Sequence, residues 1–195
     1  MKKSKTLKLA QLALLVAVVL VMAYTPLGYF RTLGLEISFL MVPITLGAIL
    51  LGPVEGAILG LVFGLTSFAT CFGSSPFGAT LLAINPVFTF ITCVVARTLA
   101  GFLAGVIFKA VKKLKIGFEI TSFIGPVLNT LFFMGCLVLF FYNTEFIQQM
   151  ATSIGAANPL TFVVAFVGLQ GVVEAVVCFI ICGVLSRNLY KVLNK

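Results

Sequence analysis

Four polar side chains lie inside long apolar runs of this sequence, and these residues are the ones that could do chemistry. They are Arg97, Asn129, Gln170 and Glu174. Counted from the basic ends of their runs at about 1.5 Å per residue, Arg97, Asn129 and Glu174 share a depth of roughly 16–20 Å. Gln170 precedes Glu174 by one helical turn, on the same helix face. Polar groups in such surroundings are costly, so each marks a candidate site.

The matching depth of Arg97 and Glu174 allows two interpretations. In the first, they form an ion pair that fixes two helices against each other. In the second, Arg97 faces an anionic ligand while Glu174, Gln170 and Asn129 supply hydrogen bonds, and the two interpretations stay open at this point. Asn85, which precedes Pro86, is a further candidate for ligand binding near the other end of its run.

Catalytic chemistry has little support, and we expect no catalytic residue, no metal and no cofactor. The chain has no histidine, and all of its acidic residues are glutamates. Most acid–base and metal-assisted hydrolysis schemes need groups that are therefore missing. The five cysteines form no CxxC pair, and no GxxxxGK[ST] loop for ATP occurs.

The composition predicts an integral membrane protein. Of the 195 residues, 61% are hydrophobic and only 9% are charged, and the mean hydropathy is +1.22. Soluble domains carry about 25% charged residues. The basic residues behind the net charge of +8 flank apolar spans and do not gather on a solvated surface with polar and aromatic groups. We therefore expect no nucleic-acid partner.

Apolar runs long enough to cross a bilayer predict an all-α bundle of six transmembrane helices in a single domain, residues 1–195. The runs are Leu7–Tyr24, Ile37–Leu51, Val54–Cys71, Leu81–Phe108, Ile116–Tyr142 and Leu160–Ser186. Polar or glycine- and proline-rich segments separate them, with Asn143–Pro159 the longest in the second half. GxxxG steps at 56–64 and 101–105 favour close helix packing inside the bundle, with subunit contact as the alternative.

Basic residues predict the orientation, because they stay on the cytoplasmic side of a membrane protein. They gather before the first run, at 109–115 between the fourth and fifth runs, and at 187–195 after the last. Both termini are therefore expected in the cytoplasm, with 25–36 and 143–159 outside.

Several stretches resemble the S component, the substrate-binding membrane subunit of energy-coupling-factor (ECF) vitamin transporters. They are Thr25-Pro-Leu-Gly-Tyr29, the run from Leu40 to Pro53, and Gly60-Leu-Val-Phe-Gly-Leu-Thr-Ser67. The similarity covers nearly the whole chain. Ser75-Pro-Phe-Gly78, followed by Asn85-Pro86, is similar to the pantothenate-type branch.

This resemblance implies a vitamin ligand, a T-component membrane subunit, two ATPase subunits and the cell membrane of a prokaryote. It also implies docking through an AxxxA step on the first helix, which Ala13 and Ala17 match, with Ala10 near the same face. Ligand contacts in the family vary with the vitamin. We expect Arg97, Asn129, Gln170, Glu174 and Asn85 to bind it, with Tyr24, Tyr29 and Phe30 closing over it.

Other functions remain as alternatives. The first is an S component that binds riboflavin, folate or a pyridoxine-type vitamin in place of pantothenate. A stand-alone carrier predicts flux without ATPases, and a membrane-embedded enzyme predicts turnover by the isolated chain.

Overall fold

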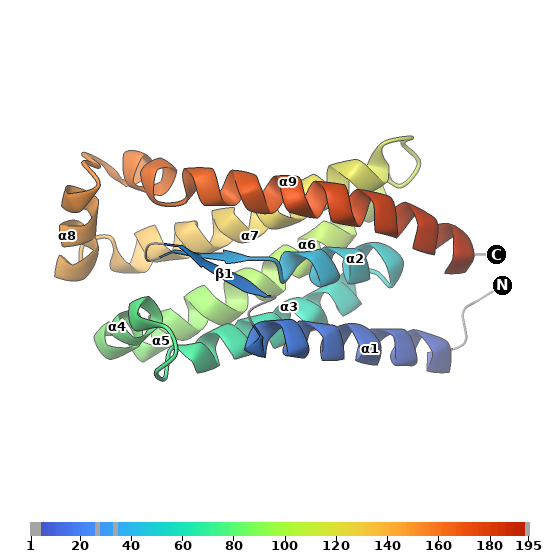
Figure 1. Ribbon diagram of the computed structural model, residues 1–195, viewed down its shortest axis with the longest axis horizontal. Helices are drawn as coiled ribbons and strands as arrows, with labels where there is room; N and C mark the ends of the chain where they lie inside the picture. Colours follow the sequence, from blue (N-terminus) through green and yellow to red (C-terminus); the bar gives the residue numbers. More distant parts are fainter. Residues whose placement is uncertain (1–4, 26–27, 33–34, 194–195) are drawn as a thin grey trace.

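The computed structural model describes residues 5–25, 28–32 and 35–193. These residues form an elongated bundle of helices with one short hairpin inserted between the first two (Figure 1). The elements are α1 (Lys5–Tyr24), β1 (Tyr29–Thr32), β2 (Leu35–Ser38), α2 (Met41–Leu50), α3 (Pro53–Thr70), α4 (Pro76–Ile84), α5 (Pro86–Phe90), the π-helical segment η1 (Ile91–Val95), α6 (Ala96–Val111), α7 (Gly117–Phe141), α8 (Glu145–Ser153) and α9 (Pro159–Leu193).

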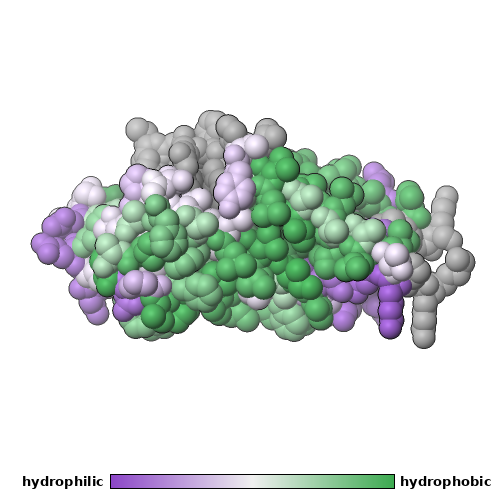
Figure 2. Space-filling view, turned by 90° about the horizontal axis from the view of Figure 1, so that it is seen from below, coloured by the Kyte–Doolittle hydropathy of each residue, from purple (hydrophilic) through white to green (hydrophobic). Residues whose placement is uncertain are grey.

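Five stretches of helix in the described part of the chain are long and apolar enough to cross a membrane. They are Lys5–Tyr24, Pro53–Thr70, Pro86–Val111, Gly117–Phe141 and Gln170–Val192. A broad apolar band lies between hydrophilic residues at the two ends of the molecule (Figure 2). The predicted membrane-embedded helical protein is therefore confirmed, although the bundle is not purely α-helical.

The helix expected at Ile37–Leu51 is wrong at its beginning. Residues 35–38 form strand β2, which pairs antiparallel with β1, and α2 begins only at Met41. At about 1.5 Å per residue, the ten residues of α2 reach about half of a ~30 Å hydrocarbon core. Pairing with β1 satisfies part of the backbone of β2, and the N–H of Ser38 finds a further acceptor outside the hairpin, in Glu174. In the sequence, the apolar residues Leu35 and Ile37 alternate with the polar residues Glu36 and Ser38, which is the pattern of a strand.

The fourth predicted helix, Leu81–Phe108, is interrupted. Pro86 has no N–H to continue the helix, so α4 ends at Ile84 and α5 begins at Pro86. The side-chain oxygen of Asn85 caps the new helix by accepting hydrogen bonds from the backbone N–H groups of Val87 and Phe88, both at 3.1 Å. The loops expected at 72–79 and 143–159 also contain helix, namely the start of α4 and the whole of α8.

The glycine steps bring α3 and α6 into backbone contact. A Cβ added at Gly56 or Gly101 would clash with the backbone of the other glycine, and one at Gly60 would clash with the carbonyl of Arg97. This close approach confirms the interpretation of the GxxxG steps as internal packing. It also fixes the backbone of α6 at Arg97.

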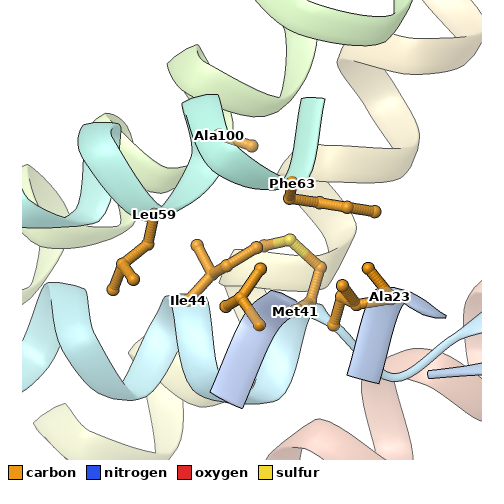
Figure 3. Packing of buried hydrophobic residues seen from close by; sticks show 8 residues of the cluster. Ala23, Met41, Ile44, Leu59, Phe63 and Ala100 are labelled. Carbon is orange, nitrogen blue, oxygen red and sulfur yellow. The ribbon is translucent and has the colours of Figure 1, made fainter. Parts of the chain in front are cut away.

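A buried apolar cluster joins α1, α2, α3 and α6 below the hairpin (Figure 3). Its members are Val19, Ala23, Leu40, Met41, Ile44, Leu59, Phe63 and Ala100. Phe63 is 1% exposed, and its ring also faces Arg97, so this cluster forms one wall of the polar site.

The start of α1 and the end of α9 lie at the same end of the bundle (Figure 1). Lys8 of α1 forms a 2.5 Å ion pair with Glu55 at the start of α3. Arg187 of α9 forms another with Glu119 in the first turn of α7. The basic segments that the sequence placed on one side of the membrane therefore gather at one end of the fold.

Candidate functional site

A buried carboxyl group on α9 anchors the hairpin. Glu174 is 7% exposed, and its Oε1 accepts a 2.6 Å hydrogen bond from the backbone N–H of Ser38. Ser38 is the last residue of β2 and lies opposite Tyr29 in the hairpin. This bond joins the first loop to the last helix, so the hairpin covers a polar site within the bundle.

The guanidinium of Arg97 is packed between two aromatic rings. Its Cζ lies 4.7 Å from the centre of the Phe63 ring on α3 and 4.8 Å from that of Phe133 on α7. Its Nη1 donates hydrogen bonds to the carbonyl oxygens of Thr92, at 3.3 Å, and Cys93, at 3.1 Å. Both carbonyls belong to η1, where the π-helical turn interrupts the regular α-helical pattern. The rings and carbonyls together stabilise a charge that is only 9% exposed.

The Nε donor of the Arg97 guanidinium has no hydrogen-bond partner among the described residues. Both of its hydrogen bonds use Nη1, while Nε is buried and makes none. The Nε–H bond lies in the plane of the guanidinium, so a further partner for this donor must approach along that edge of the group. A planar carboxylate is suited to this geometry, because it can accept two parallel N–H donors from one guanidinium.

Among the described residues, several buried oxygen atoms lack hydrogen-bond partners, and three of them lie on the elements around Arg97 and Glu174. They are Oδ1 of Asn129 on α7, Oγ1 of Thr45 on α2 and Oγ of Ser38. Buried polar atoms are nearly always hydrogen-bonded in folded proteins. Their unmet capacity therefore marks a place for a polar ligand or for ordered water.

Neighbouring contacts place Asn129 between Arg97 and Thr45. Asn129 lies one turn before Phe133, whose ring contacts Arg97, and one turn after Gly125, which packs against the Thr45 side chain. The buried groups of α2, α6 and α7 thus follow one another along a single face of α7.

The same face of α7 meets α9 beside Glu174. Gly171 of α9 faces Thr130, the residue after Asn129. Gln170, which is partly buried, lies one turn before Glu174. Four of the predicted residues, Arg97, Asn129, Gln170 and Glu174, are therefore brought together on α6, α7 and α9.

The direct Arg97–Glu174 ion pair is not formed. Both residues are described, yet no salt bridge joins them, and each uses other partners. The helix-clamp interpretation is therefore wrong in its direct form, because η1 and the two rings hold the guanidinium instead.

The remaining predicted ligand residues lie elsewhere. Asn85 precedes Arg97 by 12 residues, about 18 Å along the helix, and its carboxamide oxygen is used to cap α5. Tyr24 ends α1 and is 69% exposed. The backbones of Tyr29 and Phe30 belong to β1, but their side chains are outside the described residues.

Sequence reasoning missed Ser38, Thr45, Phe63 and Phe133. Thr45 could have been noticed as the one hydroxyl residue in the apolar α2. The two phenylalanines gave no signal, since the chain has 20 of them. Only the fold shows which rings pack on the guanidinium.

The proposed docking residues lie on the outside of the bundle. Ala10, Ala13 and Ala17 are all exposed, and α1 buries only Val19 and Ala23. An apolar helix with so little buried surface faces lipid or another membrane subunit.

The arrangement suits binding better than catalysis. A fixed cation, a buried carboxyl group and amide and hydroxyl oxygens converge from five elements under a hairpin. Within the described residues, no group of three His, Cys, Asp or Glu side chains could hold a metal ion. The fold and site define a membrane-embedded protein that binds a small polar molecule.

The chain belongs to the family of substrate-specific components of ECF transporters, whose model matches residues 7–186. It is also similar to the pantothenic acid transporter PanT of Lactococcus lactis subsp. cremoris (strain MG1363). The two are 30% identical over 178 residues, which cover 84% of this chain and 90% of that protein. This family consists of transporter subunits and not of enzymes, so the chain is a multi-pass protein of a prokaryotic cell membrane and binds a vitamin for import.

Proposed function

We propose that the vitamin bound by this chain is pantothenate. Pantothenate carries a carboxylate at one end, an amide in the middle and two hydroxyl groups at the other end. The similarity to PanT supports this ligand. The observation that carries the proposal is the buried Nε of Arg97, for which the described part of the chain offers no hydrogen-bond partner.

The carboxylate of pantothenate would bind along the Nε edge of Arg97. A buried ion pair with two parallel hydrogen bonds discriminates strongly against uncharged analogues, since the guanidinium cannot lose its proton. The stacked rings of Phe63 and Phe133 keep the group from rotating away.

The amide and hydroxyl groups would bind toward α2, α7 and α9. Asn129 Oδ1 would accept from the amide N–H, because it is buried without a partner. The hydroxyl groups would bind to Glu174, Gln170 and Thr45. Asn85, Tyr24, Tyr29 and Phe30 stay as proposed contacts at the entrance to the site.

The hairpin would serve as the outer cover of the site. The Ser38–Glu174 hydrogen bond attaches it to α9, next to the proposed hydroxyl subsite. A ligand hydroxyl that binds Glu174 would therefore also fix the hairpin, and binding and closure would be coupled.

We further propose that both termini are cytoplasmic and that the chain crosses the membrane six times. The hairpin and α2 together would make the second crossing, which brings α1 and α9 to the same end. A T component would dock on the exposed Ala10, Ala13 and Ala17 face of α1, and its ATPase subunits would hydrolyse ATP.

A panel of vitamins tests the ligand directly. The purified chain in detergent is heated with pantothenate, riboflavin, folate or pyridoxine. A ligand at 100 times its dissociation constant stabilises the folded state by about 2.7 kcal/mol, which raises the midpoint by several degrees. We expect pantothenate alone to do so. Stabilisation by another vitamin, with none by pantothenate, would refute the ligand but leave the family intact.

A further inference from the structure

A groove of about 300 Å³ lies at the basic end of the bundle, away from the vitamin site. The ends of α6 and α9 and the start of α7 form it. Its lining residues are Phe108, Lys112, Lys113, Phe118, Arg187, Tyr190 and Lys191. Four of these seven side chains are basic and none is acidic.

Three packed aromatic rings give this groove a fixed floor. The ring centres of Phe108, Phe118 and Tyr190 lie 5.1–5.9 Å from one another, in tilted and edge-to-face contacts. Phe108 is 4% exposed, so the floor belongs to the core. The groove is therefore built into the fold, with exposed lysines around a rigid base.

The groove carries excess positive charge. Arg187 is held in place by Glu119 and by the carbonyl oxygen of Lys115. Among the described residues, Lys112, Lys113 and Lys191 form no salt bridge, so three cations face the groove uncompensated. Such a surface attracts an anion with several acceptor oxygens, which a phosphate group provides.

The position of the groove favours a lipid headgroup as the source of such a phosphate group. It lies where the spans Pro86–Val111, Gly117–Phe141 and Gln170–Val192 begin or end, at the level of lipid headgroups. Apolar side chains flank it and are open to the surroundings, among them Ile116, 59% exposed, and Val192, 69% exposed. These residues can accept acyl chains while the lysines hold the headgroup.

We propose that this groove binds the phosphate group of an anionic phospholipid. The binding fixes the ends of α6, α7 and α9 against each other. It requires neither the vitamin nor a particular orientation of the chain, so it stands apart from the proposed function.

Two variants of equal charge separate the groove from general electrostatics. The groove variant carries Lys112→Gln, Lys113→Gln and Lys191→Gln. The control variant carries Lys5→Gln, Lys109→Gln and Lys115→Gln, whose side chains are outside the groove lining. Native mass spectrometry then counts phosphatidylglycerol and phosphatidylcholine molecules retained by each detergent-purified chain, and the thermal unfolding midpoint reports whether each variant is folded.

We expect the wild-type chain and the control variant to retain phosphatidylglycerol in preference to phosphatidylcholine. The groove variant should lose that preference by about 10-fold or more, because each of the three lysines near a lipid phosphate contributes about fivefold to binding. Equal losses in the two variants would overturn the proposal. So would full displacement of the lipid by the same concentration of glycerol 3-phosphate or inorganic phosphate, since the acyl chains would then contribute nothing.

Discussion

Ser38 and Glu174, 136 residues apart, are joined by one 2.6 Å hydrogen bond from a backbone N–H to a buried carboxyl oxygen. This bond attaches the first loop of the chain to its last helix. It also places the hairpin over a group of buried polar atoms from four helices.

Loss of the Glu174 acceptor should loosen the hairpin. Glu174→Ala leaves the Ser38 N–H unpaired, which costs about 1–3 kcal/mol. Hydrogen exchange of residues 35–40 should then become roughly 5- to 100-fold faster. Glu174→Gln, which keeps an acceptor oxygen, should change it less. Glu145→Ala on the exposed surface of α8 is the control, and equal exchange in that control and in Glu174→Ala would contradict the anchor.

Larger side chains on the outer face of α1 should abolish vitamin uptake without weakening vitamin binding. Ala13→Leu or Ala17→Leu should abolish pantothenate uptake in cells, since close approach of a second helix needs small side chains. Binding by the purified chain should stay within about twofold, because neither side chain is near the site. Ala165→Leu, on an exposed face of α9, is the matched control and should leave both unchanged. Normal uptake in the α1 variants would exclude this face from docking.

Cysteine labelling tests the orientation. In a chain without its native cysteines, Ser153→Cys on α8 should react with a membrane-impermeant maleimide added to whole cells. Lys113→Cys at the basic end should react only after the membrane is opened, because basic segments stay in the cytoplasm. Both residues are exposed in the fold. The reverse pattern would invert the topology.

Two glycine substitutions should have opposite effects on stability. Gly60→Ala places a methyl group against the carbonyl of Arg97, whereas nothing lies within 4 Å of a Cβ at Gly135 in α7. Gly135→Ala should therefore stabilise the chain by about 0.5–1 kcal/mol through helix propensity. Gly60→Ala should lower the thermal midpoint by several degrees, as overpacking costs about 1–3 kcal/mol. An unchanged thermal midpoint in Gly60→Ala would show that α3 and α6 can move apart.

The sequence predicts the spans well because long apolar runs and basic flanks are properties of composition. It also places Arg97, Asn129 and Glu174 on three neighbouring long helices, α6, α7 and α9, by counting residues along apolar runs. It fails at residues 35–38, because a four-residue strand inside an apolar run has the same hydropathy as the start of a helix. The single helix predicted at 81–108 is also wrong, because Pro86 cannot continue α4 and Asn85 caps a new helix there.

The partners of the site residues could not be predicted. The sequence suggested Glu174 for Arg97 because opposite charges lay at equal depth. The fold instead gives Arg97 two rings and two carbonyl oxygens from η1, and gives Glu174 a backbone N–H. Such contacts depend on helix rotation and on a π-helical turn, and neither has a signal in a single sequence.

If Arg97 binds the carboxylate of pantothenate, an analogue in which that carboxylate is replaced by a hydroxymethyl group should lose affinity for the wild-type chain. Titration calorimetry measures both compounds against the wild-type chain, Arg97→Lys and Arg97→Gln. The wild-type chain should prefer pantothenate by about 10-fold or more, because a buried guanidinium is left unpaired by the alcohol. Arg97→Lys should reduce that preference and Arg97→Gln should abolish it, while both still bind the alcohol. An unchanged preference for pantothenate in Arg97→Gln would contradict the claim.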